Sequence, residues 1–96
     1  MIRFSANAKK FLIKNGIDTI VLRFVEFETG GTVGVAKDVT VTFEPPDDAK
    51  AFGRDLVEGI EVFVDPKLKV DGDVVIKRQG FWSFSSLYVD GVRVPI

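Results

Sequence analysis

Residues 59–96 read GIEVFVDPKLKVDGDVVIKRQGFWSFSSLYVDGVRVPI, and this stretch decides the fold class. Short apolar runs rich in valine, isoleucine and phenylalanine alternate there with turn signals. Runs of this kind, bounded by Gly, Pro and Asp, are typical of β-strands. The stretch therefore predicts a series of short, mainly antiparallel strands. The turn signals are Asp65-Pro66, Asp71-Gly72-Asp73, Gln79-Gly80 and Asp90-Gly91.

Two pairs of an acidic residue and a glycine separate the predicted strands of this region. Asp90-Gly91 is the strongest hairpin signal in the chain, because a type I′ turn has positive φ at both central positions. Glu58-Gly59 predicts either a hairpin turn or a bulge. Pro95 cannot donate a hydrogen bond to a ladder, so we expect the last strand at an edge. The predicted strands cover residues 56–57, 60–65, 74–78, 81–89 and 92–96.

Residues 6–15 have the pattern of one amphipathic helix. Ser5 precedes them and predicts an N-cap, because its hydroxyl can accept a hydrogen bond from a backbone N–H of the first turn. Gly16 follows them as a C′ residue, which adopts positive φ at little cost. Before the helix, residues 2–4 predict a short edge strand. The apolar face of the helix, at i, i+3 and i+4, consists of Ala8, Phe11 and Leu12.

Between the helix and residue 56 the sequence predicts two further strands and two loops. Residues 19–28 carry β-branched and aromatic residues on both parities, which indicates a strand covered on both faces. Residues 35–43 alternate between apolar and polar, so we expect one buried face and one wet face. Three glycines within residues 29–34 indicate a loop, and residues 49–55 are expected to form another with at most one helical turn.

Together these patterns predict an α+β fold that is mainly β. It has one N-terminal helix and a mostly antiparallel, mixed sheet of six to eight short strands, which can fold into two layers. The length of 96 residues is that of a single domain, residues 1–96, with enough apolar content for one core.

The composition excludes several classes of function. The sequence contains no Cys and no His, so it offers no disulfide, no thiolate and no histidine base, and we expect no zinc site. Its 13 basic and 14 acidic residues are interspersed and give a net charge of -1, which disfavours nucleic-acid binding. The first residues lack the apolar run of a signal peptide, and no segment approaches the length of a membrane span. We therefore expect a cytoplasmic protein with no nucleic-acid and no membrane partner.

Several segments stand in an order that a known family shares. A helix with Ser, Ala and Leu at a characteristic spacing is followed by a glycine loop, a valine-rich strand and an aromatic run. These segments are Ser5, Ala8 and Leu12, then Gly31-Thr32-Val33-Gly34, then residues 59–66 and 70–76, and then residues 81–84. In this order the chain resembles the HesB-like family of A-type iron–sulfur carriers. The resemblance implies the β-rich architecture of that family.

The residues that hold an iron–sulfur cluster in the HesB-like family are missing from this chain. The family's first ligand cysteine falls on Thr32, and its Cys-Gly-Cys tail is replaced by the segment around Asp90-Gly91. Threonine is a poor ligand for such clusters, which soft thiolates hold. The resemblance therefore implies a non-catalytic HesB-like domain with no cofactor, which acts as a protein-interaction or assembly module. Its expected partner is another protein or a second copy of the chain in a homodimer.

The glycine-rich loop is the first candidate site. Its backbone amides could cradle an anion or a small ligand, although the loop lacks the Lys-Ser/Thr pair and the following helix of a P-loop. The alternative is a plain inter-strand loop. The second functional hypothesis is therefore a small-molecule or anion-binding module that uses Gly30, Gly31, Thr32 and Gly34.

An aromatic cluster near the end of the chain is the second candidate site. Aromatic side chains are enriched among interface anchors, so Trp82, Phe84 and Tyr88 predict an interface, and the alternative is that they belong to the core. Turn aspartates such as Asp65 and Asp71 are expected to bond local backbone rather than ligate a metal. The serines near the aromatic cluster have no His to activate them, so we predict no catalytic residues.

Overall fold

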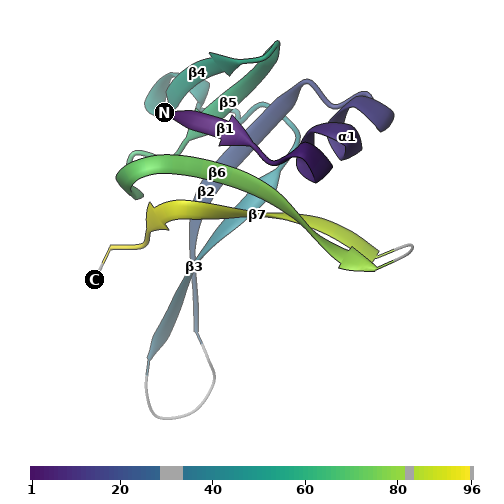
Figure 1. Cartoon of the computed structure of the whole chain (residues 1–96). Helices are drawn as coiled ribbons and strands as arrows, with labels where there is room; N and C mark the ends of the chain where they lie inside the picture. The colour runs from purple at the N-terminus through teal and green to yellow at the C-terminus, as the bar shows by residue number, and fades with distance from the viewer. Residues whose placement is uncertain (29–33, 82–83, 96) are drawn as a thin grey trace.

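The structure is a computed structural model that describes residues 1–28, 34–81 and 84–95. Its elements, in chain order, are β1 (Ile2–Phe4), α1 (Ala6–Lys14), β2 (Thr19–Glu28), β3 (Val35–Thr42), a 3₁₀ turn η1 (Ala49–Ala51), β4 (Gly53–Val57), β5 (Ile60–Val64), β6 (Lys69–Phe81) and β7 (Phe84–Arg93). The strands form two sheets, one in the order β1-β6-β7 and one in the order β3-β2-β5-β4. Figure 1 shows α1 at one end of this pair of sheets.

The α+β, mainly β fold class is confirmed, with one helix and seven strands among the described residues. Three strand pairs are antiparallel, namely β2 with β3, β4 with β5, and β6 with β7. Two pairs are parallel, β1 with β6 and β2 with β5. The sheets are therefore mixed and mostly antiparallel, as the sequence predicts, but β2, β6 and β7 are long strands rather than short ones.

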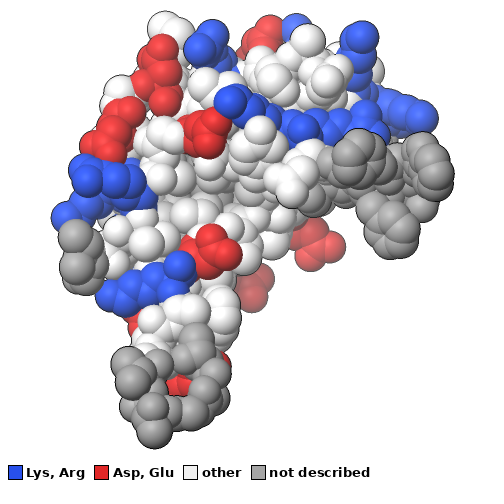
Figure 2. Space-filling model, turned by 60° about the horizontal axis from the view of Figure 1, so that its bottom comes forward, with Lys and Arg blue, Asp and Glu red and all other residues white. Residues whose placement is uncertain are grey.

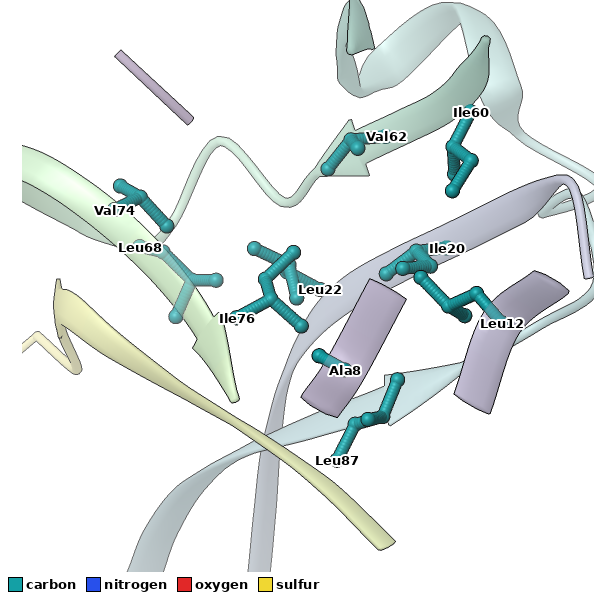
Figure 3. Packing of buried hydrophobic residues seen from close by; sticks show 10 residues of the cluster. All are labelled: Ala8, Leu12, Ile20, Leu22, Ile60, Val62, Leu68, Val74, Ile76 and Leu87. Carbon is teal, nitrogen blue, oxygen red and sulfur yellow. The ribbon is translucent and has the colours of Figure 1, made fainter. Parts of the chain in front are cut away.

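The helix α1 begins and ends as the sequence predicts. The Oγ of Ser5 accepts a hydrogen bond from the backbone N–H of Ala8 at 3.2 Å. Gly16 follows the last turn with a φ of 64°. Ala8 and Leu12 on the apolar face are fully buried, and Figure 3 shows both pointing toward residues of the two sheets. The helix is therefore anchored by its caps and by one apolar stripe.

The strands β2 and β3 form a long antiparallel hairpin whose far end projects from the rest of the molecule (Figure 1). Residues 19–22 of β2 are buried, whereas its last three residues are exposed. The prediction that this strand is covered on both faces is therefore right only for its first half. Every residue of β3 is exposed or half-buried, and Val35 is 51% exposed, so the predicted buried face of this strand is wrong at its projecting end.

The strands β3 and β4 lie at opposite edges of the four-stranded sheet, so the chain crosses that sheet between them. Phe52 at the end of this crossing segment stacks with Arg23 of β2, whose guanidinium carbon lies 5.1 Å from the ring centroid. The predicted loop over residues 49–55 is wrong in its second half, because β4 begins at Gly53. The reason is that Gly53 pairs with Val64, which extends the hairpin well beyond its turn at Glu58-Gly59.

The last third of the chain forms two long strands rather than the three short ones that the turn signals predict. The strands β6 and β7 pair from Lys69 with Arg93 to Phe81 with Phe84. The chain therefore reverses between Phe81 and Phe84, and Asp90-Gly91 lies inside β7. The predicted hairpin turn at Asp90-Gly91 is wrong.

Gly91 instead lies opposite a β-bulge in β6. The register of β6 and β7 shifts so that residues 71–74 stand opposite Gly91 alone. Gly91 has a φ of 95°, and a Cβ on it would overlap the carbonyl oxygen of Asp73 and lie 3.1 Å from the Cα of Val74. A glycine is therefore required by the close approach of β6 as well as by the backbone angle.

The bulge decides which residues of β7 face the core. In a regular strand alternate residues share a face, so one unevenly paired residue changes the parity of those that follow. Leu87 belongs to the buried core cluster, and Val89 packs against it before the bulge. After the bulge, Val92 and Val94 pack against the same cluster.

The main core lies between the two sheets and α1. Figure 3 shows its residues converging from α1, from β2 and β5 of one sheet, and from β6 and β7 of the other. Among the described residues, no helix is long and apolar enough to span a bilayer. The buried cluster consists of Ala8, Leu12, Ile20, Leu22, Ile60, Val62, Leu68, Val74, Ile76 and Leu87.

Candidate functional site

The predicted ligand loop falls mostly outside the described residues. Gly30, Gly31 and Thr32 lie outside them, and Gly34 lies within them. Gly34 is exposed, with a φ of 109°, immediately before β3. A site for a small ligand or an anion at this loop therefore stays a prediction.

The predicted aromatic interface is described in part. Trp82 lies outside the described residues, and Phe84 is the first residue of β7. Tyr88, four residues further along β7, is 39% exposed and pairs in register with Lys77 of β6. Tyr88 is also at the margin of a groove that the sequence does not predict.

This groove lies between β3 and β7 and has a volume of about 530 Å³. Strand β3 contacts β7, although the two strands belong to different sheets. The groove therefore lies where the two sheets approach each other, and apolar residues that pack against the core form part of its lining. It is lined by Lys37, Asp38, Val39, Leu87, Tyr88, Val89, Val92, Arg93 and Val94.

Both strands that flank the groove are edge strands. Among the described residues, β3 is the first strand of its sheet and pairs with β2 alone, and β7 is the last strand of the other sheet and pairs with β6 alone. An edge strand presents a row of backbone N–H and C=O groups that have no partner strand. The groove thus combines apolar side chains with two strand edges.

The local sequence of β3 and β7 builds the apolar lining. On β3, Val39 pairs in register with Phe24 of β2, and both pack against the core cluster. On β7, the bulge at Gly91 lets residues on both sides of it face inward. The valines of this lining are half-buried rather than buried, so part of the inter-sheet core remains accessible from the groove.

Charged residues of both signs stand at the rim of the groove. Arg93 forms a salt bridge with Asp71, and the backbone N–H of Val39 donates to the Oδ1 of Asp38 at 2.8 Å. Lys37 has no ion pair within the described part of the chain. Figure 2 shows one face of the molecule on which charged side chains of both signs surround a mainly uncharged middle.

The outward face of the three-stranded sheet is polar close to Tyr88. The Nζ of Lys77 lies 2.6 Å from the Oδ2 of Asp90, a diagonal cross-strand pair. The hydrogen bond and the charge of Asp90 raise the pKa of Lys77 above its ordinary value of 10.5. This pair is exposed on both sides, and we assign it to the stability of the sheet rather than to a site.

A second hollow, of about 660 Å³, lies beside the end of β3. Its lining combines Arg23 with the two carboxylates Glu44 and Asp47 and with two prolines. Arg23 is already stacked on Phe52. This hollow therefore presents mainly carboxylates and prolines, beside Val41 of β3 and the following Phe43.

Of the turn aspartates, Asp65 bonds local backbone as predicted, whereas Asp71 and Asp73 pair with cations instead. Asp65 is only 8% exposed, and its carboxylate accepts hydrogen bonds from the backbone N–H groups of Phe24 and Lys67, both at 3.0 Å. Asp71 pairs with Arg93, and Asp73 lies 3.8 Å from the N-terminal amine. No group of three or more metal-ligating side chains occurs among residues 1–28, 34–81 and 84–95.

Neither the curated proteins nor the solved structures contain a match to this chain. A family model described as the CC/Se motif containing family matches residues 1–92. The match extends from β1 into the last strand, so it includes the helix and all but the end of the sheets, and seven of the nine residues that line the groove. Because it spans nearly the whole sequence, the chain belongs to the CC/Se motif containing family.

Proposed function

We propose that this chain is a non-catalytic protein-interaction module that binds its partner at the groove between β3 and β7. The observation that carries the proposal is that half-buried valines, which pack against the core, line a groove flanked by two edge strands. Strand edges bind extended chains through backbone hydrogen bonds, and apolar pockets beside them supply specificity.

The chemistry of the sequence supports a binding role over a catalytic one. The family's description names a CC/Se motif, yet this chain has no cysteine at any position. It also has no histidine, so the two side chains that most often serve as nucleophile and base near neutral pH are missing. The charged groups around the groove are instead a lysine, an arginine and an aspartate at its rim, which suit recognition.

Two finer parts of the proposal come from the order of sequence elements. We propose that the domain is HesB-like, without the cysteines that ligate clusters in that family, and that it acts in the cytoplasm. The match to the CC/Se motif containing family does not bear on this resemblance. The proposed loss of cluster binding is tested by anaerobic incubation with iron and sulfide, followed by absorbance. We expect no stoichiometric cluster, because no thiolate is present.

The interaction role is tested with two variants that each replace an apolar residue by lysine, one inside the groove and one outside it. Val92→Lys places a charge in the groove, whereas Leu56→Lys places one on β4, where Leu56 is 68% exposed and lies outside the groove. The tagged chain and both variants are used to capture partners from a lysate of the source cells. Each captured protein is then purified and titrated against the three chains, and the mass of the free chain is measured by light scattering.

We expect a purified partner, or a second copy of the chain, to bind the wild-type chain and Leu56→Lys equally. Val92→Lys should bind at least about tenfold more weakly, because the lysine must be desolvated on binding. Circular dichroism must show that all three chains are equally folded. A partner that binds Val92→Lys as tightly as wild type would overturn the assignment of the function to this groove.

A further inference from the structure

We infer that Asp55 keeps the free edge of β4 from pairing with the β4 of a second copy of the chain, and that its removal lets two copies join their four-stranded sheets. This inference concerns a part of the molecule outside the groove and does not depend on the proposed function. It follows from three features of β4: its exposure, the direction of its backbone groups, and the register in which two copies would pair.

The strand β4 is an uncovered edge of the four-stranded sheet. Among the described residues it pairs with β5 alone. Its residues from Gly53 to Leu56 are all exposed, and Leu56 is 68% exposed. Figure 1 shows the strand at the margin of the molecule. An edge of this kind is a template for pairing with another chain unless a side chain obstructs it.

The backbone groups of Arg54 and Leu56 face the free side of β4. Val57 and Ile60 flank the two-residue turn, so they exchange hydrogen bonds across the hairpin. Every second residue of β4 counted from Val57 therefore faces β5, and the residues between them turn their backbone groups away from it. In agreement with this direction, the N–H of Leu56 donates to the Oδ1 of Asp55 at 2.9 Å. The carboxylate thus occupies a donor that an added strand would need.

The register of the pairing adds a second obstacle at the same residue. Two antiparallel copies of β4 related by a two-fold axis pair along their whole length only when Asp55 of one stands opposite Asp55 of the other. In this register Arg54 of each copy exchanges backbone hydrogen bonds with Leu56 of the other, and a shift in either direction shortens the pairing. The two Asp55 carboxylates then lie directly opposite each other, and like charges in that position destabilise a sheet.

Asp55 therefore closes this edge in two ways, by occupying the N–H of Leu56 and by repelling its own copy. Without it, the same register covers the exposed leucine. Leu56 of each copy would lie opposite Arg54 of the other, which pairs with Glu61 and whose guanidinium carbon lies 5.6 Å from the ring centroid of Phe63. An arginine held in this way offers the apolar stem of its side chain to the leucine.

The inference is tested by the solution mass of variants, measured by light scattering over a range of protein concentrations. We expect Asp55→Ala to self-associate at least about tenfold more tightly than the wild-type chain. Asp38→Ala is the matched control, because Asp38 accepts the same kind of bond, from the N–H of Val39 at 2.8 Å. This control opens no edge to a second folded copy, since Asp38 lines the groove where β3 already contacts β7. We therefore expect its mass to equal that of the wild-type chain.

The double variant Asp55→Ala/Leu56→Lys separates pairing at β4 from any other association. Its lysine would lie opposite Arg54 of the second copy, so we expect the mass to return to that of the wild-type chain. If Asp55→Ala associates no more than Asp38→Ala, or if Leu56→Lys leaves its association intact, the inference is overturned. A wild-type dimer that Leu56→Lys dissociates would overturn it as well, because the edge would then be open with Asp55 in place.

Two controls keep this test independent of the proposed function. Circular dichroism must show that all variants are equally folded. The same series is also made in the Val92→Lys background, which removes any association through the groove. We expect Asp55→Ala to associate as tightly in that background as in the wild-type one. Association that Val92→Lys abolishes belongs to the groove, and it would overturn the assignment to β4 while the proposed function stands.

Discussion

Two pairs of an acidic residue and a glycine, Glu58-Gly59 and Asp90-Gly91, look alike in the sequence but have different structural roles. Both glycines have positive φ, 84° at Gly59 and 95° at Gly91. Both acids pair with a lysine: Glu58 lies 2.7 Å from Lys9, and Asp90 lies 2.6 Å from Lys77. Yet the first pair reverses the chain between β4 and β5, whereas the second lies inside β7.

The difference lies in what surrounds each glycine. Glu58 itself has a φ of 50°, so both central residues of its turn have the positive angles of a type I′ hairpin. A Cβ on Gly59 would meet nothing within 4 Å, whereas one on Gly91 would overlap the backbone of β6. A glycine after an acidic residue thus indicates a backbone position with positive φ. Whether that position lies in a turn or beside a bulge depends on the pairing with a strand distant in sequence, which at Gly91 is β6.

The largest expected effect comes from Gly91→Ala. The alanine would be strained at positive φ and would also overlap the carbonyl oxygen of Asp73. Together these two costs are expected to lower the free energy of unfolding by about 3 kcal/mol or more. Urea denaturation followed by circular dichroism measures this change as a shift of the midpoint. A loss no larger than that of Gly59→Ala would contradict the close approach of β6.

The same comparison explains how much of the fold can be predicted from the sequence. The helix is predicted almost to the residue, because Ser5 and Gly16 act within one turn of its ends. The strand pattern predicts the fold class for a similar reason, since alternation is local. The predicted turn at Gln79-Gly80 is wrong, because these two residues lie inside β6, where they pair with Ser86 and Ser85 of β7.

A third acidic turn residue, Asp65, differs from Glu58 and Asp90 because it accepts hydrogen bonds from both local and distant backbone. Its carboxylate accepts from Lys67, two residues away, and from Phe24 in β2. Asp65→Ala would leave two backbone donors of a largely buried region without their partner, at an expected cost of about 2 kcal/mol in unfolding free energy. Asp65→Asn keeps one acceptor oxygen and should cost less. Hydrogen exchange at the Phe24 amide should quicken in both variants, and an unchanged rate would refute the bond to β2.

Gly59→Ala is the matched counterpart of Gly91→Ala. The substituted residue has open space, so only the backbone angle opposes it, and we expect a loss of about 1 kcal/mol in unfolding free energy. The same urea titration measures it. If Gly59→Ala destabilises the chain as strongly as Gly91→Ala, then backbone strain alone explains both glycines and steric overlap explains neither.

The candidate site is harder to predict than the fold because it joins distant segments. Val39 and Val92 line one groove although 53 positions separate them, and nothing local to either indicates the other. One signal was available in β7. Leu87 and Val89 alternate as in a strand, and Val92 and Val94 resume the alternation out of phase, which indicates an irregularity in the strand between these two pairs. This change of phase around Asp90-Gly91 predicts one continuous strand whose apolar residues face inward on both sides of Gly91, rather than a turn.

The smallest expected effect concerns the acid of the second pair. The hydrogen bond from Lys77 to Asp90 raises the pKa of Lys77, so the folded state binds this proton more tightly than the unfolded state. The resulting contribution to stability is complete below pH 10.5, the ordinary pKa, and is lost as the pH rises through the higher pKa of the folded chain.

Asp90→Asn should lower the pKa of Lys77, which NMR of its side chain can follow. Because the pair is exposed, the urea midpoint near neutral pH should move only slightly. The register of β6 and β7 around Gly91 should be retained without the Lys77–Asp90 pair. A large loss of stability in Asp90→Asn would mean that the acid, rather than the glycine, holds β7 in register.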